Sequence, residues 1–222
     1  MAALANASSP TVFRVQAGPA LVAIATGLLC VMAKTGRPAR ALNLFRHVAG
    51  SWMSREGFTL PTLFGCGLIA LWQGRAGAMA VIAAVSALLF LYCQARILRA
   101  AHGIPAWSVA GIVPLLLSSG LAEGIGVASL AGLVVPGTST SILAELLAGA
   151  LALRLLAWIR YRGDLGRAVA PQESLDVLQA IAQRFVLGGH VAPLCLALGA
   201  LASAGQASAV SLAVGGLLAA GS

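Results

Sequence analysis

The residues of this 222-residue chain that could carry chemistry are its few ionisable side chains, since only 9% of the residues are charged while 59% are hydrophobic. Glu56, His47 and His190 are of the types that accept and donate protons near neutral pH. Glu56 stands where a basic stretch meets an apolar one, and partial burial there would raise the pKa of its carboxyl and suit it to proton transfer. The alternative is that Glu56 pairs with a nearby arginine and stabilises the fold.

The stretch from Lys34 to Glu56 is unusually basic for this chain. It contains five of the 14 Lys and Arg residues, namely Lys34, Arg37, Arg40, Arg46 and Arg55. Apolar segments long enough to cross a bilayer lie on either side of it. A basic loop between two such segments must face water, lipid headgroups or another protein, so we expect it to be the working surface of the molecule.

Composition places the chain among membrane proteins. A soluble domain has about 25% charged residues, and the 9% found here cannot cover a water-facing surface. The apolar runs are continuous rather than alternating, which favours helices over a β-barrel. The 26 glycines and the many alanines are typical of helices that pack closely in lipid. The sequence therefore predicts an all-α fold, a polytopic transmembrane helical bundle of about seven spans.

The chain is expected to have one main domain. We predict a loose N-terminal tail over 1–13 and a single transmembrane helical domain over 14–222. The predicted spans lie near 15–33, 57–73, 77–95, 107–135, 141–159, 185–204 and 208–221. The fourth is longer than the ~20 residues that cross a bilayer, so it should tilt, or break near Pro114 or Gly120. Between the fifth and sixth, the polar insert 160–184 contains an amphipathic helix expected along the membrane interface or on the surface.

Basic residues divide unevenly when successive loops are assigned to opposite sides. One side collects 11 Lys and Arg residues, the other has Arg14 and Arg75, and Arg154 falls within a span. The positive-inside rule then places the basic side in the cytoplasm. It also accounts for the net charge of +8 without nucleic acid as a partner. A docking surface for a protein would be basic as well, and the sequence does not separate these two causes.

Three ionisable residues, Glu123, Glu145 and Arg154, fall within the predicted spans. Such residues are costly in lipid and suggest function by default. Glu145 and Arg154 are nine residues apart, which at ~100° per residue puts them on opposite faces of one helix. We therefore expect Arg154 to meet Glu123 on a neighbouring helix. Glu123 could belong to a proton path, and a structural pair between helices is the alternative.

No metal or haem site is expected. The four cysteines stand singly in apolar segments, without the spacing of a zinc or iron–sulfur site. A membrane b-type haem normally takes two axial ligands from spans. Of the three histidines, His102 falls in a loop and only His190 stands near a span, so a haem held by two histidines is not expected.

Three motifs carry a resemblance to a known family. The first combines Gly36 and Pro38 with Arg40, Ala41, Asn43 and the ending Ser54, Arg55 and Glu56; the others are GLAEG at 120–124 and LGGHVAPL at 187–194. Together they resemble the membrane-anchor subunits of molybdopterin oxidoreductases, of the dimethyl sulfoxide reductase and polysulfide reductase types. The sequence of the first motif resembles that of the branch to which phenylacetyl-CoA:acceptor oxidoreductase belongs. The family usually has eight spans, one more than predicted here.

The resemblance implies a non-catalytic integral membrane subunit. It would anchor an iron–sulfur electron-transfer subunit and a molybdopterin catalytic subunit on the cytoplasmic side of the inner (cytoplasmic) membrane. It would pass electrons between the partner's iron–sulfur cluster and membrane quinone, in anaerobic respiratory electron transport. Quinone would be an exchangeable substrate among the membrane lipids.

A quinone site needs an apolar slot, hydrogen bonds to the carbonyl oxygens and a proton carrier. The candidate quinone-binding and proton-transfer residues are Glu56, His47, His190, Arg40, Asn43 and Lys34. Lys34 stands where the dimethyl sulfoxide reductase anchor has a histidine implicated in quinol binding. The other arginines of the stretch, Arg37, Arg46 and Arg55, are expected to dock the partner. The alternative function is a small multi-span transporter or channel, and a stand-alone membrane enzyme is a third.

Overall fold

The computed structural model describes residues 9–34, 50–101, 103–130, 140–168, 172–202 and 206–221. Within these ranges the chain is helical and has no strand. Part of the basic stretch lies outside them. The candidate residues that fall outside the described residues are Arg37, Arg40, Asn43, Arg46 and His47, together with His102.

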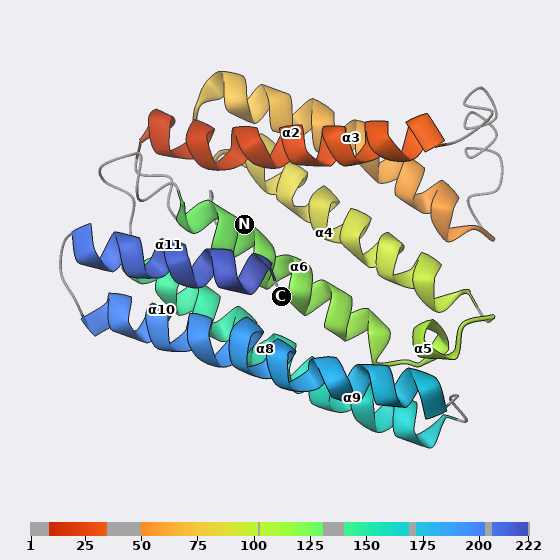
Figure 1. Ribbon diagram of the computed structural model, residues 1–222. Coiled ribbons are helices and arrows are strands. Elements are labelled where there is room, and N and C mark those ends of the chain that lie inside the picture. Colours follow the sequence, from red (N-terminus) through yellow and green to blue (C-terminus); the bar gives the residue numbers. More distant parts are fainter. Residues whose placement is uncertain are drawn as a thin grey trace.

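The described helices form an up-and-down bundle (Figure 1). The long ones are α2 (Pro10–Lys34), α3 (Trp52–Gln73), α4 (Ala78–Arg99), α6 (Ile112–Ser129), α8 (Thr140–Arg167), α9 (Gln172–Val186), α10 (Ala192–Ala202) and α11 (Gln206–Ala220). A short helix, α5 (Pro105–Ser108), precedes α6, and the π-helical turn Leu187–Val191 joins α9 to α10. In Figure 1, α2, α3 and α4 lie together on one side of α6, and α8 to α11 lie on the other.

Among the described residues, five helices are long and apolar enough to cross a membrane. They are α2, α4, α6, α8 and the segment Leu175–Ala200, which runs from α9 into α10. Helix α3 is not among them, and α11 is apolar over the shorter range Ala209–Ala219. The chain thus has the character of a multi-pass membrane protein, while the predicted count of seven spans is not confirmed.

The first helix begins earlier than predicted. The expected tail over 1–13 already becomes helical at Pro10, and the hydroxyl of Ser9 accepts a hydrogen bond from the Val12 N–H at 3.2 Å. A serine before a proline at the first helical position is a strong start signal, since it satisfies a free N–H group. Val12 and Phe13 are buried, so the end of the predicted tail belongs to the bundle.

The predicted long span over 107–135 is broken near its beginning, and not near Pro114 or Gly120, since α6 continues through both positions. Val109 is extended, with ψ of 149°, and α6 begins at Ile112. Between them, Gly111 lies against the backbone of α8, where a Cβ atom would stand 2.6 Å from the Cα of Tyr161. The chain therefore turns where Gly111 lies close against α8, and α6 is left with a length suited to one crossing.

The predicted interface helix and the sixth span, expected to begin at 185, form one continuous helical segment instead. The Ala192 N–H donates to the Leu187 carbonyl, five residues back, which is the π-helical pattern. Pro193 has no N–H, and its ring would crowd the carbonyl four residues back in a regular α-helix. The wider π turn accommodates the proline and keeps the segment unbroken, so His190 lies within a helical segment and not at its beginning.

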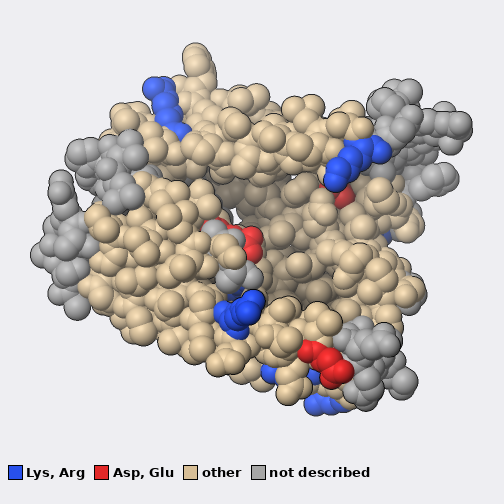
Figure 2. All heavy atoms as spheres, in the orientation of Figure 1, with Lys and Arg blue, Asp and Glu red and all other residues tan. Residues whose placement is uncertain are grey.

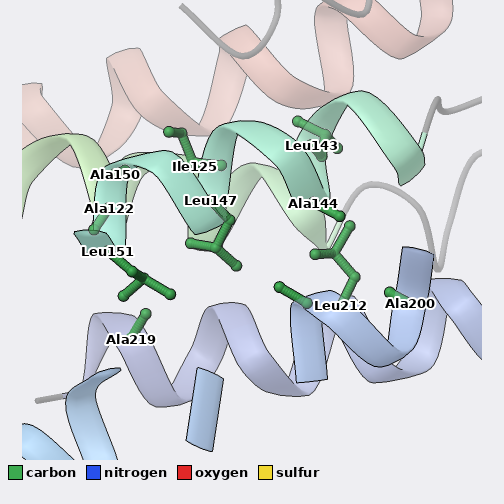
Figure 3. Packing of buried hydrophobic residues seen from close by; sticks show 11 residues of the cluster. Ala122, Ile125, Leu143, Ala144, Leu147, Ala150, Leu151, Ala200, Leu212 and Ala219 are labelled. Carbon is green, nitrogen blue, oxygen red and sulfur yellow. The ribbon is translucent and has the colours of Figure 1, made fainter. Parts of the chain in front are cut away.

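The largest cluster of buried residues in the described part of the chain lies between α6, α8, α10 and α11 (Figure 3). Leu143, Leu147 and Leu151 on α8 are almost completely buried against small residues of the neighbouring helices. Helices α6 and α11 come so close that a Cβ atom at Gly126 would lie 2.5 Å from the carbonyl oxygen of Gly216. Contact between backbones of this kind is how helices associate in lipid.

The layer of α2, α3 and α4 has a smaller buried core, because α2 packs only weakly on α3, although α3 and α4 are in close contact. Its core cluster contains Phe13, Ala70 and Ala80, and most of α2 is exposed. Arg14 fastens α2 to the end of α3 by donating to the carbonyls of Leu71 and Trp72 at 3.0 and 3.1 Å. Uncharged atoms cover most of the face in Figure 2, as a surface in contact with lipid requires, and that face is hollowed beneath this layer.

Candidate functional site

The described basic residues gather mainly at one end of the bundle, which we call the basic end. Helices α2, α4 and α8 finish there, and α3 and α9 begin there (Figure 1). It carries Lys34, Arg55, Arg96, Arg99, Arg160, Arg162 and Arg167, whereas Arg14 and Arg75 belong to the opposite end and Arg184 lies near the end of α9, away from the basic end. Apart from Arg184, the helix directions agree with the predicted division of charge. Lys34 itself is exposed at the end of α2.

Charged and aromatic side chains meet at the basic end where α3 begins and α4 finishes. We call this group the α3–α4 cluster; its members are Trp52, Arg55, Glu56, Tyr92, Gln94 and Arg96. Helix α3 starts at this point because the hydroxyl of Ser51 accepts a hydrogen bond from the Ser54 N–H at 3.3 Å. At the other end of the hairpin, Gly74 has a φ of +63°, a conformation that favours glycine and turns the chain into α4.

Glu56 is the acid of this cluster. Its side chain is half-buried, and Oε1 accepts a hydrogen bond from the Nε2 amide of Gln94 at 2.5 Å. Burial raises the pKa of the Glu56 carboxyl above its usual value, and the hydrogen bond from Gln94 opposes that rise. A carboxyl of this kind holds its proton closer to neutral pH than an exposed one, so Glu56 can act as a proton carrier.

Two arginines of the cluster are held on one ring. The guanidinium carbons of Arg55 and Arg96 lie 4.3 and 4.4 Å from the ring centroid of Trp52. Trp52 meets Tyr92 edge to face, with centroids 5.7 Å apart, and Arg96 also donates to the Tyr92 hydroxyl at 3.4 Å. The indole attracts both cations, so two positive charges are held on one ring at the end of the hairpin that also carries Glu56.

A second polar group lies deeper, between α6, α8 and α9. We call it the α6–α8–α9 cluster; its members are Glu123, Arg154, Trp158, Phe185 and His190. Arg154 is only 2% exposed, and its Nη1 donates to the carbonyl of Ala219 in the last turn of α11 at 3.0 Å. The guanidinium also lies 4.7 Å from the ring centroid of Phe185.

The sequence predicts that Arg154 meets Glu123 on a neighbouring helix. In the structure, Arg154 on α8 interacts electrostatically with Glu123 on α6. The hydrogen bond to Ala219 shows that Arg154 also fastens the end of α11. Glu145 is exposed while Arg154 is buried, in agreement with their predicted positions on opposite faces of α8. Of the three charges assigned to spans, only Glu145 is therefore remote from this cluster.

His190 belongs to this second cluster. It is 3% exposed, and its Nδ1 lies 2.9 Å from the carbonyl oxygen of Phe185. Because a carbonyl only accepts, Nδ1 must carry the proton in this contact. Nε2 is buried and has no hydrogen-bond partner in the part of the chain that the structure describes. No hydrogen bond or ring contact among those residues joins His190 to Glu56, so the two predicted proton carriers occupy different clusters.

Four members of the α3–α4 cluster were not among the residues selected from the sequence: Trp52, Tyr92, Gln94 and Arg96. A signal for them exists in the spacing. In a hairpin of two antiparallel helices, residues equally far from the turn lie at the same level. Glu56 and Gln94 stand at equal distances in sequence from Arg75 in the turn, and this symmetry predicts their contact once α3 and α4 are accepted as a hairpin.

No group of three His, Cys, Asp or Glu side chains within the described ranges could hold a metal ion. What the described residues offer is a half-buried acid at Glu56 and a group of cations at the basic end. Comparison with known proteins found no matching family model, no matching curated protein and no matching solved structure.

Proposed function

We propose that this chain is the membrane anchor and quinone-interacting subunit of a molybdopterin iron–sulfur oxidoreductase. The α3–α4 cluster carries the proposal, because it combines a half-buried acid and two arginines at the basic end of an apolar bundle. The class of complex comes from the resemblance of the stretch between Lys34 and Glu56 to the anchor family. The competing hypothesis is that Glu56 only stabilises the fold, and the experiment must distinguish this role from proton transfer.

The arginines support docking of a soluble redox subunit. Arg55 and Arg96 are held on Trp52, so less side-chain freedom is lost when a partner binds them. An acidic surface around the partner's iron–sulfur cluster would complement this basic end. Arg37 and Arg46 belong to the same stretch of sequence and would extend the docking surface, while Arg40 stays among the candidate quinone-binding residues.

Glu56 supports proton exchange with quinone. Conversion of a quinol to a quinone releases two electrons and two protons. The electrons would pass one after the other to the partner's cluster, the Glu56 carboxylate would accept one proton, and water at the basic end would accept the other. The reverse reaction would take that proton back. Gln94 holds the carboxyl in place, and the exposed apolar side chains of Met53 and Phe58 give access from lipid. His47, Asn43 and Lys34 remain candidate partners for the quinone oxygens.

In this proposal α3 and α11 also lie within the bilayer, which gives about seven spans in the inner membrane. The positive-inside rule then places the basic end and the docked subunits in the cytoplasm. The complex would serve anaerobic respiratory electron transport.

Purification of the chain in mild detergent from cells that express it with its neighbouring genes tests the proposal. We expect iron–sulfur and molybdopterin subunits to co-purify, with iron and molybdenum in fixed ratio to the chain. Glu56→Gln should keep both partners and lower quinone turnover by about 100-fold, the usual contribution of a proton carrier. A chain that purifies without either metal, or a variant that loses its partners, would contradict it.

One observation favours the alternative of a small transporter or channel. The π-helical turn beside buried Arg154 and His190 is an irregular helix next to intramembrane charge, a feature of some transporters. Ion flux through vesicles that contain the purified chain alone would support this alternative, whereas the anchor function predicts no flux without the partner subunits.

A further inference from the structure

An open groove of about 460 Å³ lies between α9 and the end of α11. It is lined by Ile181, Arg184, Phe185 and Gly188 from the α9 side and by Leu217, Leu218 and Gly221 from the α11 side. The residues of the α9 side recur at the spacing of neighbours on one helix face. The groove is therefore largely apolar and contains a single cation.

Arg184 lies within the candidate span Leu175–Ala200, at the border between its polar and apolar parts. The part of α9 before it is amphipathic, and no Lys, Arg, Asp or Glu occurs after it in the chain. A basic side chain at such a border reaches the headgroup level while the apolar residues beyond it lie in the hydrocarbon. The groove thus extends from the headgroup region towards the membrane interior.

Arg184 is available to a ligand. Its side chain is exposed and makes no hydrogen bond or ion pair with the residues that the structure describes. Phe185, which lines the groove beside it, contacts the guanidinium of Arg154, so a second positive charge lies next to the same wall. Gly188 leaves room for an acyl chain, since a Cβ atom added there would have no neighbour within 4 Å.

We propose that this groove binds an anionic phospholipid, with its phosphate on Arg184 and an acyl chain along Phe185, Gly188 and Leu217. An arginine binds phosphate through two parallel hydrogen bonds, and basic pockets between membrane helices are suited to anionic headgroups. Inorganic phosphate would gain nothing from the apolar wall, and a neutral quinone tail would gain nothing from Arg184. The lipid combines both features of the groove.

Native mass spectrometry of the purified full chain in detergent, with added phosphatidylglycerol or phosphatidylcholine of identical acyl chains, tests this site. We expect tighter binding of phosphatidylglycerol to the wild type, and a loss of that preference by about ten-fold in Arg184→Gln, in line with one charge-assisted contact. Gly188→Leu should weaken binding of both lipids by filling the groove. Arg75→Gln and Gly149→Leu, at exposed positions outside the groove, are matched controls that should change neither.

Several outcomes would overturn the inference. One is equal binding of the two lipids to the wild type, and another is an unchanged preference in Arg184→Gln. A third is loss of the preference in Arg162→Gln alone, since Arg162 lines a separate groove on another side of α9. Displacement of phosphatidylglycerol by inorganic phosphate would show that the apolar wall plays no part in binding. Displacement by a neutral quinone would show that Arg184 plays no part in binding.

Discussion

The two polar clusters differ in how their charges are compensated. In the α6–α8–α9 cluster, Arg154 is almost completely buried. It donates a hydrogen bond to the end of α11, contacts the ring of Phe185 and interacts electrostatically with Glu123. In the α3–α4 cluster the arginines and Glu56 are half-buried at a helix end, and rings and an amide hold them. A fully buried charge must be compensated within the fold. A half-buried one can still exchange a proton or bind a partner.

The sharpest test of this contrast is Arg154→Met. It removes the hydrogen bond to the Ala219 carbonyl and the contact with Phe185, so the end of α11 loses its attachment to α8. We expect the free energy of unfolding to fall by about 3 kcal/mol, from one charged hydrogen bond and one buried cation–π contact. Unfolding of detergent-solubilised protein by a denaturing detergent measures it. Arg162→Met, at an exposed position of α8, should cost almost nothing.

Close packing around the deep cluster gives the next largest effect. Leucine at Gly126 would force α6 away from α11, because the added Cβ would already collide with the Gly216 carbonyl. We expect a loss of about 2 kcal/mol, as for other overpacked sites. At Gly65 on α3 a Cβ atom meets open space, so Gly65→Leu should be neutral in the same unfolding measurement. Equal losses in the free energy of unfolding at the two positions would contradict the close approach of α6 and α11 at Gly126.

Trp52→Ala tests the α3–α4 cluster itself. The indole holds both Arg55 and Arg96, and its removal should lower the free energy of unfolding by about 1 kcal/mol, since partly exposed cation–π contacts are worth less than buried ones. The docking arginines would lose their fixed positions, and partner binding should weaken in a co-purification assay. Trp72→Ala is the control, because Trp72 is 82% exposed at the far end of α3; a similar loss there would argue against a special role for Trp52.

Glu56→Gln should have the smallest effect on folding, since a glutamine can still accept the hydrogen bond from Gln94. The pKa of Glu56 is raised from its usual 4.5 by burial, so the folded chain binds this proton more tightly than the unfolded chain. Wild-type stability therefore falls as pH rises from 4.5 through the folded pKa. Glu56→Gln has no carboxyl at this position to titrate, so it does not lose stability in this way as pH rises.

Thermal unfolding of wild type and Glu56→Gln between about pH 4 and about pH 8 measures this difference. The variant should match the wild type at the acidic end and exceed it in stability as pH rises. A variant that becomes less stable than the wild type at neutral pH would show that the ionised carboxylate contributes to the fold, as in the alternative of a structural ion pair.

The helical class could be predicted from sequence, and so could two members of the α3–α4 cluster, Arg55 and Glu56, for reasons visible in particular residues. Continuous apolar runs predict helices without any tertiary information, and the spacing of Glu145 and Arg154 predicts their opposite faces. The π turn at His190 was missed because it depends on how Pro193 is accommodated within an otherwise unbroken helix. The attachment of Arg154 to Ala219 was missed because a backbone carbonyl at a helix end has no signature in the sequence. Gln94 was missed because its partnership with Glu56 appears only when two helices are aligned about their turn.

The central claim is that the basic end docks a soluble redox subunit, and site-specific photo-crosslinking in cells tests it most directly. A photoreactive residue at Arg99, where α4 finishes at the basic end, is compared with one at Arg75 in the turn at the opposite end. The docking proposal predicts an adduct with an iron–sulfur subunit from position 99 and none from position 75. An adduct from position 75 alone, or the absence of any adduct from position 99 in cells that produce the whole complex, would contradict it.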